Sequence, residues 1–440
     1  MSRIARRIGS IALATTLTAV TFAAIAIAGL SQPASSNEGR QGTPAARPAP
    51  TRTPAPNQLV VAIVLGQTGT DTTDAFAPYE VFSSSPSFFV YTVAASTEAA
   101  PVDGSMAVLP DHTFDEVASG AAPTPDLVVV PAVNDPADAQ EAGARDFISS
   151  QYHAGARILG VCAGSRLLAA SGSLDGLRAT SHWSRISALT ESNPEVTWVT
   201  GERFVQDGRV TTTGGVTSGI PGSLGVLADM AGDAEAARIG NTIRYPGWSP
   251  DASTAMPAQR FGSEDAPLIL NTVFPWGRPS VGVELRDGVG EIDVPSIVAV
   301  YTYSQAATAA AYSRTGSITT QHGIEIRTAT SVSSSEVSVV AGQLGAPGSE
   351  QGLDAAFELL SRSAGSSVVR SASKMLEYPI YRVTPEVAPW DKQVRAPLLV
   401  ILSLAVAVGV GLLPLSVSRW VRRARTSATA GQPTTERAAS

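Results

Sequence analysis

The 440-residue chain has a single cysteine, Cys162, and only four histidines. One cysteine excludes an internal disulfide and a zinc site made of several cysteines. The histidines are scattered and do not lie at metal-ligand spacings, so we expect neither a metal nor another cofactor. Cys162 is therefore either an inert core thiol or a chemically active group.

Basic residues are scarce in the middle of the chain. Of the 31 Lys and Arg, six lie in residues 1–56 and five in residues 396–440, and each of these two segments holds one of the 38 Asp and Glu. Residues 57–395 therefore hold 20 basic and 36 acidic side chains, a net charge of −16. A surface with this balance repels phosphate backbones, so we expect no nucleic-acid partner.

Two long apolar segments lie near the ends of the chain. Residues 1–30 have three arginines followed by an uncharged apolar stretch, which is typical of a signal peptide or of a retained signal anchor, and the sequence leaves both open. Residues 396–417 are uncharged and, at about 33 Å as a helix, long enough to span a bilayer. The arginines of the tail at 418–440 favour the cytoplasm for that end, with residues 31–395 on the outer side of the cell membrane.

Between these segments the sequence predicts an α/β fold. A Pro/Ala-rich linker at 31–56 is too poor in large apolar residues to fold. After it, apolar runs of strand length alternate with helix-like stretches, which indicates a parallel sheet covered on both faces. These runs lie at 59–65, 88–93, 127–130 and 158–161.

The main chemical signal is the pentapeptide Gly160–Gly164, which reads Gly-Val-Cys-Ala-Gly after the fourth apolar run. This is the pattern of a nucleophile elbow, in which a sharp strand-to-helix turn strains the nucleophile and the flanking glycines, here Gly160 and Gly164, leave room for the turn. A cysteine at a helix N-terminus is more readily ionised, so we expect a lowered pKa for Cys162. A buried core thiol is the alternative.

Three further segments make this pattern specific: Asp74–Phe82 (DAFAPYEVF), Gly172–Trp183 (GSLDGLRATSHW) and Gly214–Ile220 (GGVTSGI). With them, residues 57–246 resemble the DJ-1/PfpI family of the class I glutamine-amidotransferase-like superfamily, in the manner of isocyanide hydratases and of the sensor domains of some transcription regulators. The resemblance implies a flavodoxin-like sandwich.

The resemblance also implies three catalytic candidates, Cys162, Asp74 and His182. Asp74 matches an acidic residue that hydrogen-bonds the elbow cysteine, and it would be protonated beside a thiolate and act as a general acid or base. Its alternative role is that of an N-cap for the following helix. His182 matches a family histidine that orients the site or shuttles protons, and a structural histidine is the alternative.

The chain departs from the family at the backbone groups expected to hold an oxyanion. Active members usually have Gly-Gly after the strand that ends here at Pro131, whereas this chain has Ala132 and Val133. Ala163 stands where relatives carry histidine or threonine, but it keeps its backbone N–H. The oxyanion candidates are therefore Ala132, Val133 and Ala163, and the sequence leaves open whether the hole is kept.

After a linker at 247–279, residues 280–380 resemble part of the first domain. The matching segments are Asp74–Phe82 with Asp293–Tyr301 and Leu224–Pro246 with Phe357–Pro379. Nothing in the second segment matches the block with Cys162 and His182, so it is interpreted as a degenerate partial repeat of the first domain. We expect it to pack on 57–246 as an intramolecular pseudo-dimer, since family members commonly form homodimers. An independent stalk is the alternative.

Two functions remain open. The first is a membrane-anchored, extracytoplasmic cysteine-nucleophile enzyme (a hydrolase, hydratase or lyase) acting on a small molecule. The second is a non-catalytic sensor or binding module with an oxidation-sensitive cysteine. The elbow and Asp74 favour the enzyme, whereas Ala132 and Val133 favour the sensor. Because one fold hosts many functions, the resemblance does not decide between them.

Overall fold

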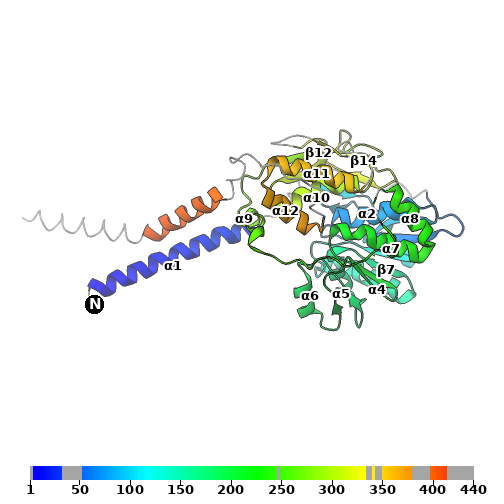
Figure 1. Cartoon of the computed structure of the whole chain (residues 1–440), viewed down its shortest axis with the longest axis horizontal. Coiled ribbons are helices and arrows are strands. Elements are labelled where there is room, and N and C mark those ends of the chain that lie inside the picture. Colours follow the sequence, from blue (N-terminus) through cyan, green and yellow to red (C-terminus); the bar gives the residue numbers. More distant parts are fainter. Residues whose placement is uncertain are drawn as a thin grey trace, which may run out of the picture. The chain divides into compact units, whose positions relative to one another are not determined.

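The computed structural model describes residues 3–31, 52–243, 245, 248–332, 339–341, 349–378 and 397–413 (Figure 1). The chain divides into two compact units. The apolar unit comprises Met1–Gln32, Ile269–Gly277 and Trp390–Ser440, and the α/β unit comprises Pro33–Leu268 and Arg278–Pro389. The predicted linker at 31–56 lies largely outside the described residues, and the tail at 418–440 lies wholly outside them.

A seven-stranded sheet organises the first half of the α/β unit, in the order β10-β11-β7-β6-β1-β2-β5. Its strands are β1 (Leu59–Val64), β2 (Phe88–Ala94), β5 (His112–Thr113), β6 (Leu127–Val130), β7 (Arg157–Gly160), β10 (Phe204–Asp207) and β11 (Val210–Thr213). Neighbouring strands are parallel except for β10 and β11. The predicted parallel α/β sheet is therefore confirmed, and its continuous apolar runs follow from burial on both faces.

Helices cover both faces of this sheet. They are α2 (Thr72–Ser83), α3 (Phe114–Ala118), α4 (Ala142–Ala154), α5 (Ser165–Ala170), α7 (Gly219–Ala231) and α8 (Asp233–Thr242), and the chain also forms α6 (Ile186–Ser192). Val61 and Ile63 of β1 share one core with the apolar side chains of α2 and α7. Ala62 and Val64 share a second core with those of α4 and α5. The alternation along β1 follows from the two-residue period of a strand.

The second half of the α/β unit has a smaller parallel sheet, in the order β13-β12-β16. Its elements are β12 (Ser280–Glu284), α10 (Asp293–Ser304), β13 (Thr308–Tyr312), β16 (Val339–Val340), α11 (Ser349–Ser363) and α12 (Ser366–Met375). β12 lies between two parallel neighbours, β13 and β16, in the same way that β1 lies between β2 and β6.

The two halves share one core and one antiparallel sheet. The apolar side chains of α10 and β12 belong to the same cluster as those of α2 and β1. The shared sheet runs β14-β15-β4-β3, so that β15 of the second half pairs with β4 of the first half. Its strands are β3 (Ala100–Val102), β4 (Met106–Val108), β14 (Ser317–Thr319) and β15 (Glu325–Arg327), and a separate small sheet holds β8 (Arg178–Ala179) and β9 (Thr197–Trp198).

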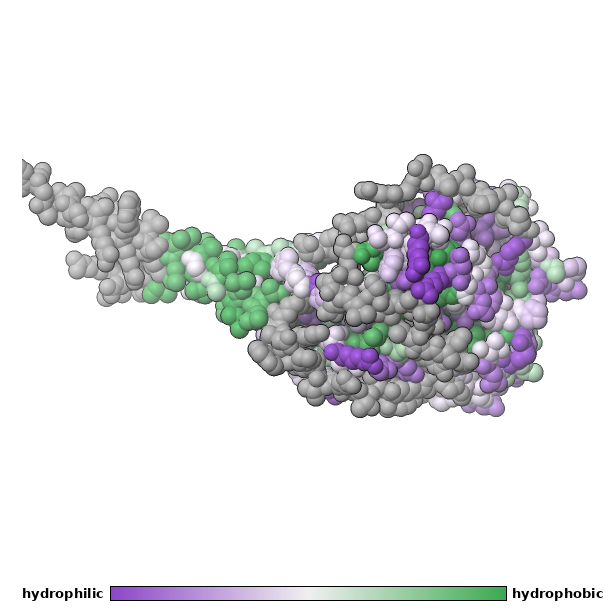
Figure 2. Space-filling model, turned by 90° about the horizontal axis from the view of Figure 1, so that it is seen from above, coloured by the Kyte–Doolittle hydropathy of each residue, from purple (hydrophilic) through white to green (hydrophobic). Residues whose placement is uncertain are grey.

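The apolar unit contains α1 (Arg3–Leu30) and a shorter apolar helix, Pro397–Leu413. Among the described residues, one helix is long and apolar enough to cross a membrane, namely α1 with its stretch Ile11–Leu30 of mean hydropathy 2.1. Both helices present apolar side chains on the face seen in Figure 2. The predicted span at 396–417 extends beyond the described residues at both ends.

The two helices of the apolar unit contact each other through small residues. A Cβ atom added to Gly411 would lie 2.1 Å from Thr18 Oγ1 and 2.7 Å from the Ala14 carbonyl oxygen, so this position accepts only glycine at the observed separation. Ala14 and Ala407 are buried, whereas most large apolar side chains of these helices are exposed. One more helix, α9 (Ala266–Val273), lies within the predicted linker at 247–279.

Candidate functional site

Cys162 lies on a sharp turn between β7 and α5. Its φ angle is +54°, in the left-handed region that is unusual for a residue with a side chain. A Cβ atom at Gly164 would lie 2.1 Å from the Val130 carbonyl oxygen, and one at Gly160 would lie 2.5 Å from the Leu168 side chain. The strained turn and the two glycines have the geometry expected of a nucleophile elbow.

Asp74 lies beside this thiol at the start of α2. Its carboxyl group is buried, and Oδ2 accepts a hydrogen bond from the Ala132 N–H at 3.2 Å. The carboxyl group also interacts with the Cys162 thiol, whereas Oδ1 is buried without a nitrogen or oxygen partner. Asp71 caps α2, since its Oδ1 accepts from the N–H groups of Thr73 (2.9 Å) and Asp74 (3.1 Å). The alternative role of Asp74 as the N-cap is therefore wrong.

Burial controls the protonation of both groups. It raises the pKa of Asp74 well above its usual value, and the neighbouring Asp71 raises it further. Burial also raises the pKa of the Cys162 thiol, which Asp74, Asp71 and Glu377 raise further. Our expectation of a lowered Cys162 pKa is therefore wrong, because burial among carboxyl groups outweighs a short helix end. Both shifts favour the protonated form of each group.

The backbone groups expected to hold an oxyanion are only partly available. The Ala132 N–H already donates to Asp74, and its carbonyl oxygen accepts from the Asp71 N–H at 2.9 Å. Val133 is buried and forms an isolated antiparallel β-bridge with Thr70. The Ala163 N–H interacts with the sulfur of Cys162 itself and lowers its pKa, but less than burial raises it. Of the three candidates, Ala163 is the one whose N–H faces the reacting atom.

His182 lies at the contact between the two halves of the α/β unit. Its Nε2 lies 2.8 Å from the Met375 carbonyl oxygen, which can only accept, so Nε2 carries the proton. Its Nδ1 lies 2.7 Å from Ser184 Oγ. Burial lowers the pKa of His182 to about 4, so the ring is neutral. Both nitrogens are thus engaged away from Cys162, which corresponds to the structural alternative.

Two residues near Cys162 come from the second half, and the sequence analysis did not identify them. Tyr303 of α10 donates to Asp71 Oδ2 at 2.8 Å. Glu377, after α12, accepts from Ser218 Oγ at 2.8 Å through Oε2. Nothing in their local sequence marks either residue, and only the expected packing of the second half on α2 could have pointed to them.

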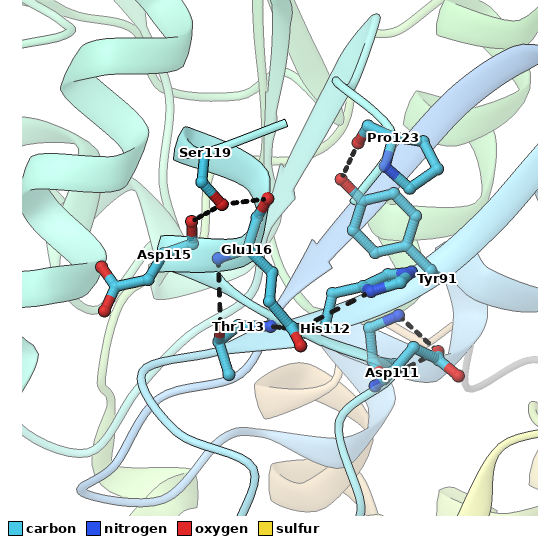
Figure 3. Close-up of polar contacts among 9 residues, drawn as sticks. Tyr91, Asp111, His112, Thr113, Asp115, Glu116, Ser119 and Pro123 are labelled. Atoms are coloured by element: carbon cyan, nitrogen blue, oxygen red, sulfur yellow. Dashed lines mark hydrogen bonds and ion pairs between the residues drawn. The ribbon is translucent and has the colours of Figure 1, made fainter. Parts of the chain in front are cut away.

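His112 lies at an edge of the large sheet, in contact with an aromatic ring and a carboxylate. His112 packs edge-on against Tyr91 at 4.9 Å and lies 3.8 Å from the Glu116 carboxylate, at the β5 edge of the large sheet (Figure 3). Tyr91 in turn donates to the Pro123 carbonyl oxygen at 2.8 Å. Within the part of the chain that the structure describes, no group of three or more His, Cys, Asp or Glu could hold a metal ion.

Comparisons with known proteins match the first half of the α/β unit. The model of the DJ-1/PfpI family matches residues 60–226. The isonitrile hydratase of Pseudomonas putida is 31% identical over 176 residues, which cover 39% of this chain and 72% of that protein. The HTH-type transcriptional regulator CdhR of Pseudomonas aeruginosa is 33% identical over 146 residues, covering 33% of this chain and 42% of the regulator. A ThiJ/PfpI family protein from Pseudomonas syringae has a similar structure, with a TM-score of 0.39 and 27% identity over 51% of this chain and 88% of that protein.

Proposed function

The chain belongs to the DJ-1/PfpI family, and from this we propose that it is a cysteine-dependent enzyme that acts on a small molecule by nucleophilic addition at Cys162. The observation that carries the proposal is the strained elbow, which holds the Cys162 thiol against the buried carboxyl group of Asp74. The reaction class is that of a hydrolase, hydratase or lyase. The isonitrile hydratase among its relatives makes water addition to an isonitrile the first reaction to test.

A proton relay through Asp74 fits a site in which burial favours the protonated form of both groups. The sulfur of Cys162 forms a bond to an unsaturated carbon of the substrate, and the thiol proton passes to Asp74. Asp74 gives its own proton to the substrate atom that gains the electron pair, so no net charge develops in the buried site. Water then adds to the same carbon, and the sulfur leaves and takes back a proton. The Ala163 N–H is placed to stabilise the charge on the sulfur.

Turnover of isonitriles by the purified full-length chain tests this proposal. We expect formamide products from the wild type, and loss of turnover in Cys162→Ser and Asp74→Asn. Asp175→Asn is the matched control, because Asp175 is exposed. Equal turnover by the wild type and Cys162→Ser would contradict the proposal.

A binding module without catalysis is the second candidate, and three observations favour it. Cys162 is 2% exposed, its pKa is raised, and the Ala132 N–H is not free to hold an oxyanion. A raised pKa also makes the thiol slower to oxidise, so this candidate is a ligand-binding module rather than a redox sensor. Saturable binding of a small molecule without turnover would support it.

We further propose that residues 280–380 are a degenerate partial repeat that acts as a built-in pseudo-dimer partner. When Asp293 is aligned with Asp74, Ile326 is equivalent to Ala107 and Arg327 is equivalent to Val108. In the structure Val108 pairs with Ile326, and Ala107 pairs with Arg327. Each pair thus joins the same two equivalent positions with the halves exchanged, as expected for strands that meet at a two-fold axis.

We also propose that the apolar unit anchors the protein in the cell membrane, with the α/β unit outside the cytoplasm. The close contact of Gly411 with Thr18 supports retention of α1, because cleavage after residue 30 would leave the Gly411 face without this neighbour. Small residues that allow close approach are typical of helix pairs within a bilayer. The N-terminal segment is then a signal anchor rather than a signal peptide.

A further inference from the structure

The last residues of the second half lie against the elbow of the first half. Lys374–Tyr378, called the closing segment below, comprises the last two residues of α12 and the three residues after them. His182 donates to the Met375 carbonyl oxygen at 2.8 Å, and the Thr217 N–H donates to the Leu376 carbonyl oxygen at 3.2 Å. Two predicted features of the first half, His182 and the segment Gly214–Ile220, therefore bind this segment.

Further contacts hold both ends of the closing segment. The Trp183 indole N–H donates to the Lys374 carbonyl oxygen at 3.2 Å, and the Lys374 ammonium group lies 5.6 Å from the centre of the Trp183 ring. Thr217 Oγ1 donates to the Glu377 carbonyl oxygen at 3.0 Å. The two hydrogen bonds run from side chains of the first half to backbone oxygens of the closing segment. They therefore depend on the backbone conformation of the segment and not on which side chains it carries.

Glu377 adopts a strained conformation that directs its carboxyl group over a glycine turn. Its φ angle is +54°, and its Oε2 accepts from Ser218 Oγ at 2.8 Å. A Cβ atom added to Gly215 would lie 2.6 Å from Glu377 Cδ, and one added to Gly214 would lie 2.9 Å from Oε2. The carboxyl group therefore occupies the space that side chains would take at both glycines, called its glycine seat below, and the backbone of Gly215 lowers its pKa by a hydrogen bond.

Acidic groups from several elements affect the pKa of Cys162. Asp74 of α2, the cap residue Asp71 and Glu377 of the closing segment raise it, and the thiol in turn raises the pKa of Tyr303 on α10. The glycine seat of Glu377 lies next to the elbow, because Thr213, which precedes Gly214 and Gly215, accepts a hydrogen bond from the Cys162 N–H at 3.1 Å through Oγ1. Asp103 raises the pKa of Asp74, Asp71 raises that of Asp103, and Arg203 lowers that of Glu377. Of the three carboxyl groups that act on the thiol, Glu377 is the one from the second half, and each of them disfavours the thiolate.

We propose that Glu377 is a positioning residue of the Cys162 site, supplied by the second half, and that the closing segment covers this site. This inference rests on the proposed role of Cys162 as the nucleophile. Burial raises the pKa of Glu377 itself, but its carboxylate still disfavours the thiolate at the higher pH at which Cys162 ionises, and replacing it by glutamine removes this effect. The second half is then an internal restraint on the first, in addition to being its packing partner.

The ionisation of Cys162 tests this role. Because the chain has one cysteine, the absorbance of the full-length protein at 240 nm, less that of the same protein carrying Cys162→Ser, follows one thiolate as the pH is raised. We expect Glu377→Gln to lower the midpoint by about one pH unit, which gives about tenfold more thiolate at neutral pH. Glu377→Asp, which keeps the charge, should restore the wild-type midpoint. Glu358→Gln, an exposed site on α11, should not change it.

An unchanged midpoint in Glu377→Gln would overturn the inference. Faster modification of Glu377→Gln than of the wild type by iodoacetamide, with an unchanged midpoint of the Cys162 titration, would also overturn it. Glu377 would then act on Cys162 by packing alone. The result is separable from the proposed function, since the titration needs no turnover. If Cys162→Ser keeps full turnover but Glu377→Gln shifts the midpoint, the enzyme proposal fails and the assignment of Glu377 stands.

Discussion

Tyr303 donates a hydrogen bond to the carboxylate of Asp71 over 2.8 Å, between residues 232 positions apart in the chain. Asp71 caps α2 through the N–H groups of Thr73 and Asp74, so this bond connects α10 of the second half to the acid beside Cys162. The second half thus contacts the site on two sides, through Tyr303 and through Glu377.

Removal of this hydroxyl should destabilise the cap without affecting the overall packing. Tyr303→Phe leaves Asp71 Oδ2 without its donor, and we expect a loss of about 1–3 kcal/mol in the free energy of unfolding, measured with urea. Tyr152→Phe is the control, because Tyr152 lies on α4, against the opposite face of the large sheet. An equal loss in both variants would show that the Tyr303 bond has no special weight.

Cys162 should react slowly. With 2% exposure and a raised pKa, we expect the folded chain at neutral pH to react with iodoacetamide at least about tenfold more slowly than free cysteine. Urea should remove the difference, because unfolding exposes the thiol. A folded-state rate equal to that of free cysteine would contradict the structure of the site.

The elbow should not tolerate a side chain at Gly164. The added Cβ atom would meet the backbone oxygen of Val130, which cannot rotate away, so Gly164→Ala should destabilise the protein by about 3 kcal/mol or prevent folding. Gly143→Ala is the matched control, because Gly143 lies in α4 and its added Cβ atom would lie 3.6 Å from the Phe114 ring, an ordinary van der Waals contact. Thermal unfolding of the two variants measures the difference, and a stable Gly164→Ala protein would refute the close approach.

Stability should fall as the pH rises from about 6.5 to 8. Burial, with Asp71 as a second cause, raises the pKa of Asp103 to about 8, and burial raises that of Glu80 to about 7. The folded state therefore binds more protons than the unfolded state in this range, so the free energy of unfolding decreases with pH. Asp103→Asn should reduce the slope, whereas Asp115→Asn, at an exposed position on α3, should leave it unchanged. A stability that rises over this range would contradict the raised values.

The proposed membrane anchor makes a topological prediction. Protease added to cells stripped of outer layers should cut the α/β unit and spare the arginine-rich tail, and N-terminal sequencing should find α1 retained. Gly411→Leu should weaken the contact with Thr18. Cysteines introduced at the exposed positions Leu13 and Leu412 should then cross-link less readily. Gly409→Leu is the control and should not change the cross-linking, because a Cβ atom at Gly409 meets open space. Release of the wild-type protein by a salt wash would contradict anchoring.

The sequence was sufficient to predict the large parallel sheet and the elbow. Both depend on local pattern: continuous apolar runs mark strands buried on both faces, and Gly160 and Gly164 mark a turn that only small residues allow. The pairing of Asp74 with Cys162 was predicted only through the family resemblance. The fold accounts for it, because Asp74 comes after β1 and Cys162 after β7, and the carboxyl ends of parallel strands meet at one edge of the sheet.

Tertiary structure alone decided the electrostatics of the site. The helix-end argument predicted an ionised thiol, but the degree of burial and the nearby Asp71 and Glu377 reversed the direction of the pKa shift. Whether the Ala132 N–H is free depends on the orientation of Asp74. Glu377 reaches Ser218 across 159 positions of the chain, and no local pattern encodes such a contact. Local sequence determines which turns and strands form, whereas the charge state of a buried group depends on which distant side chains surround it.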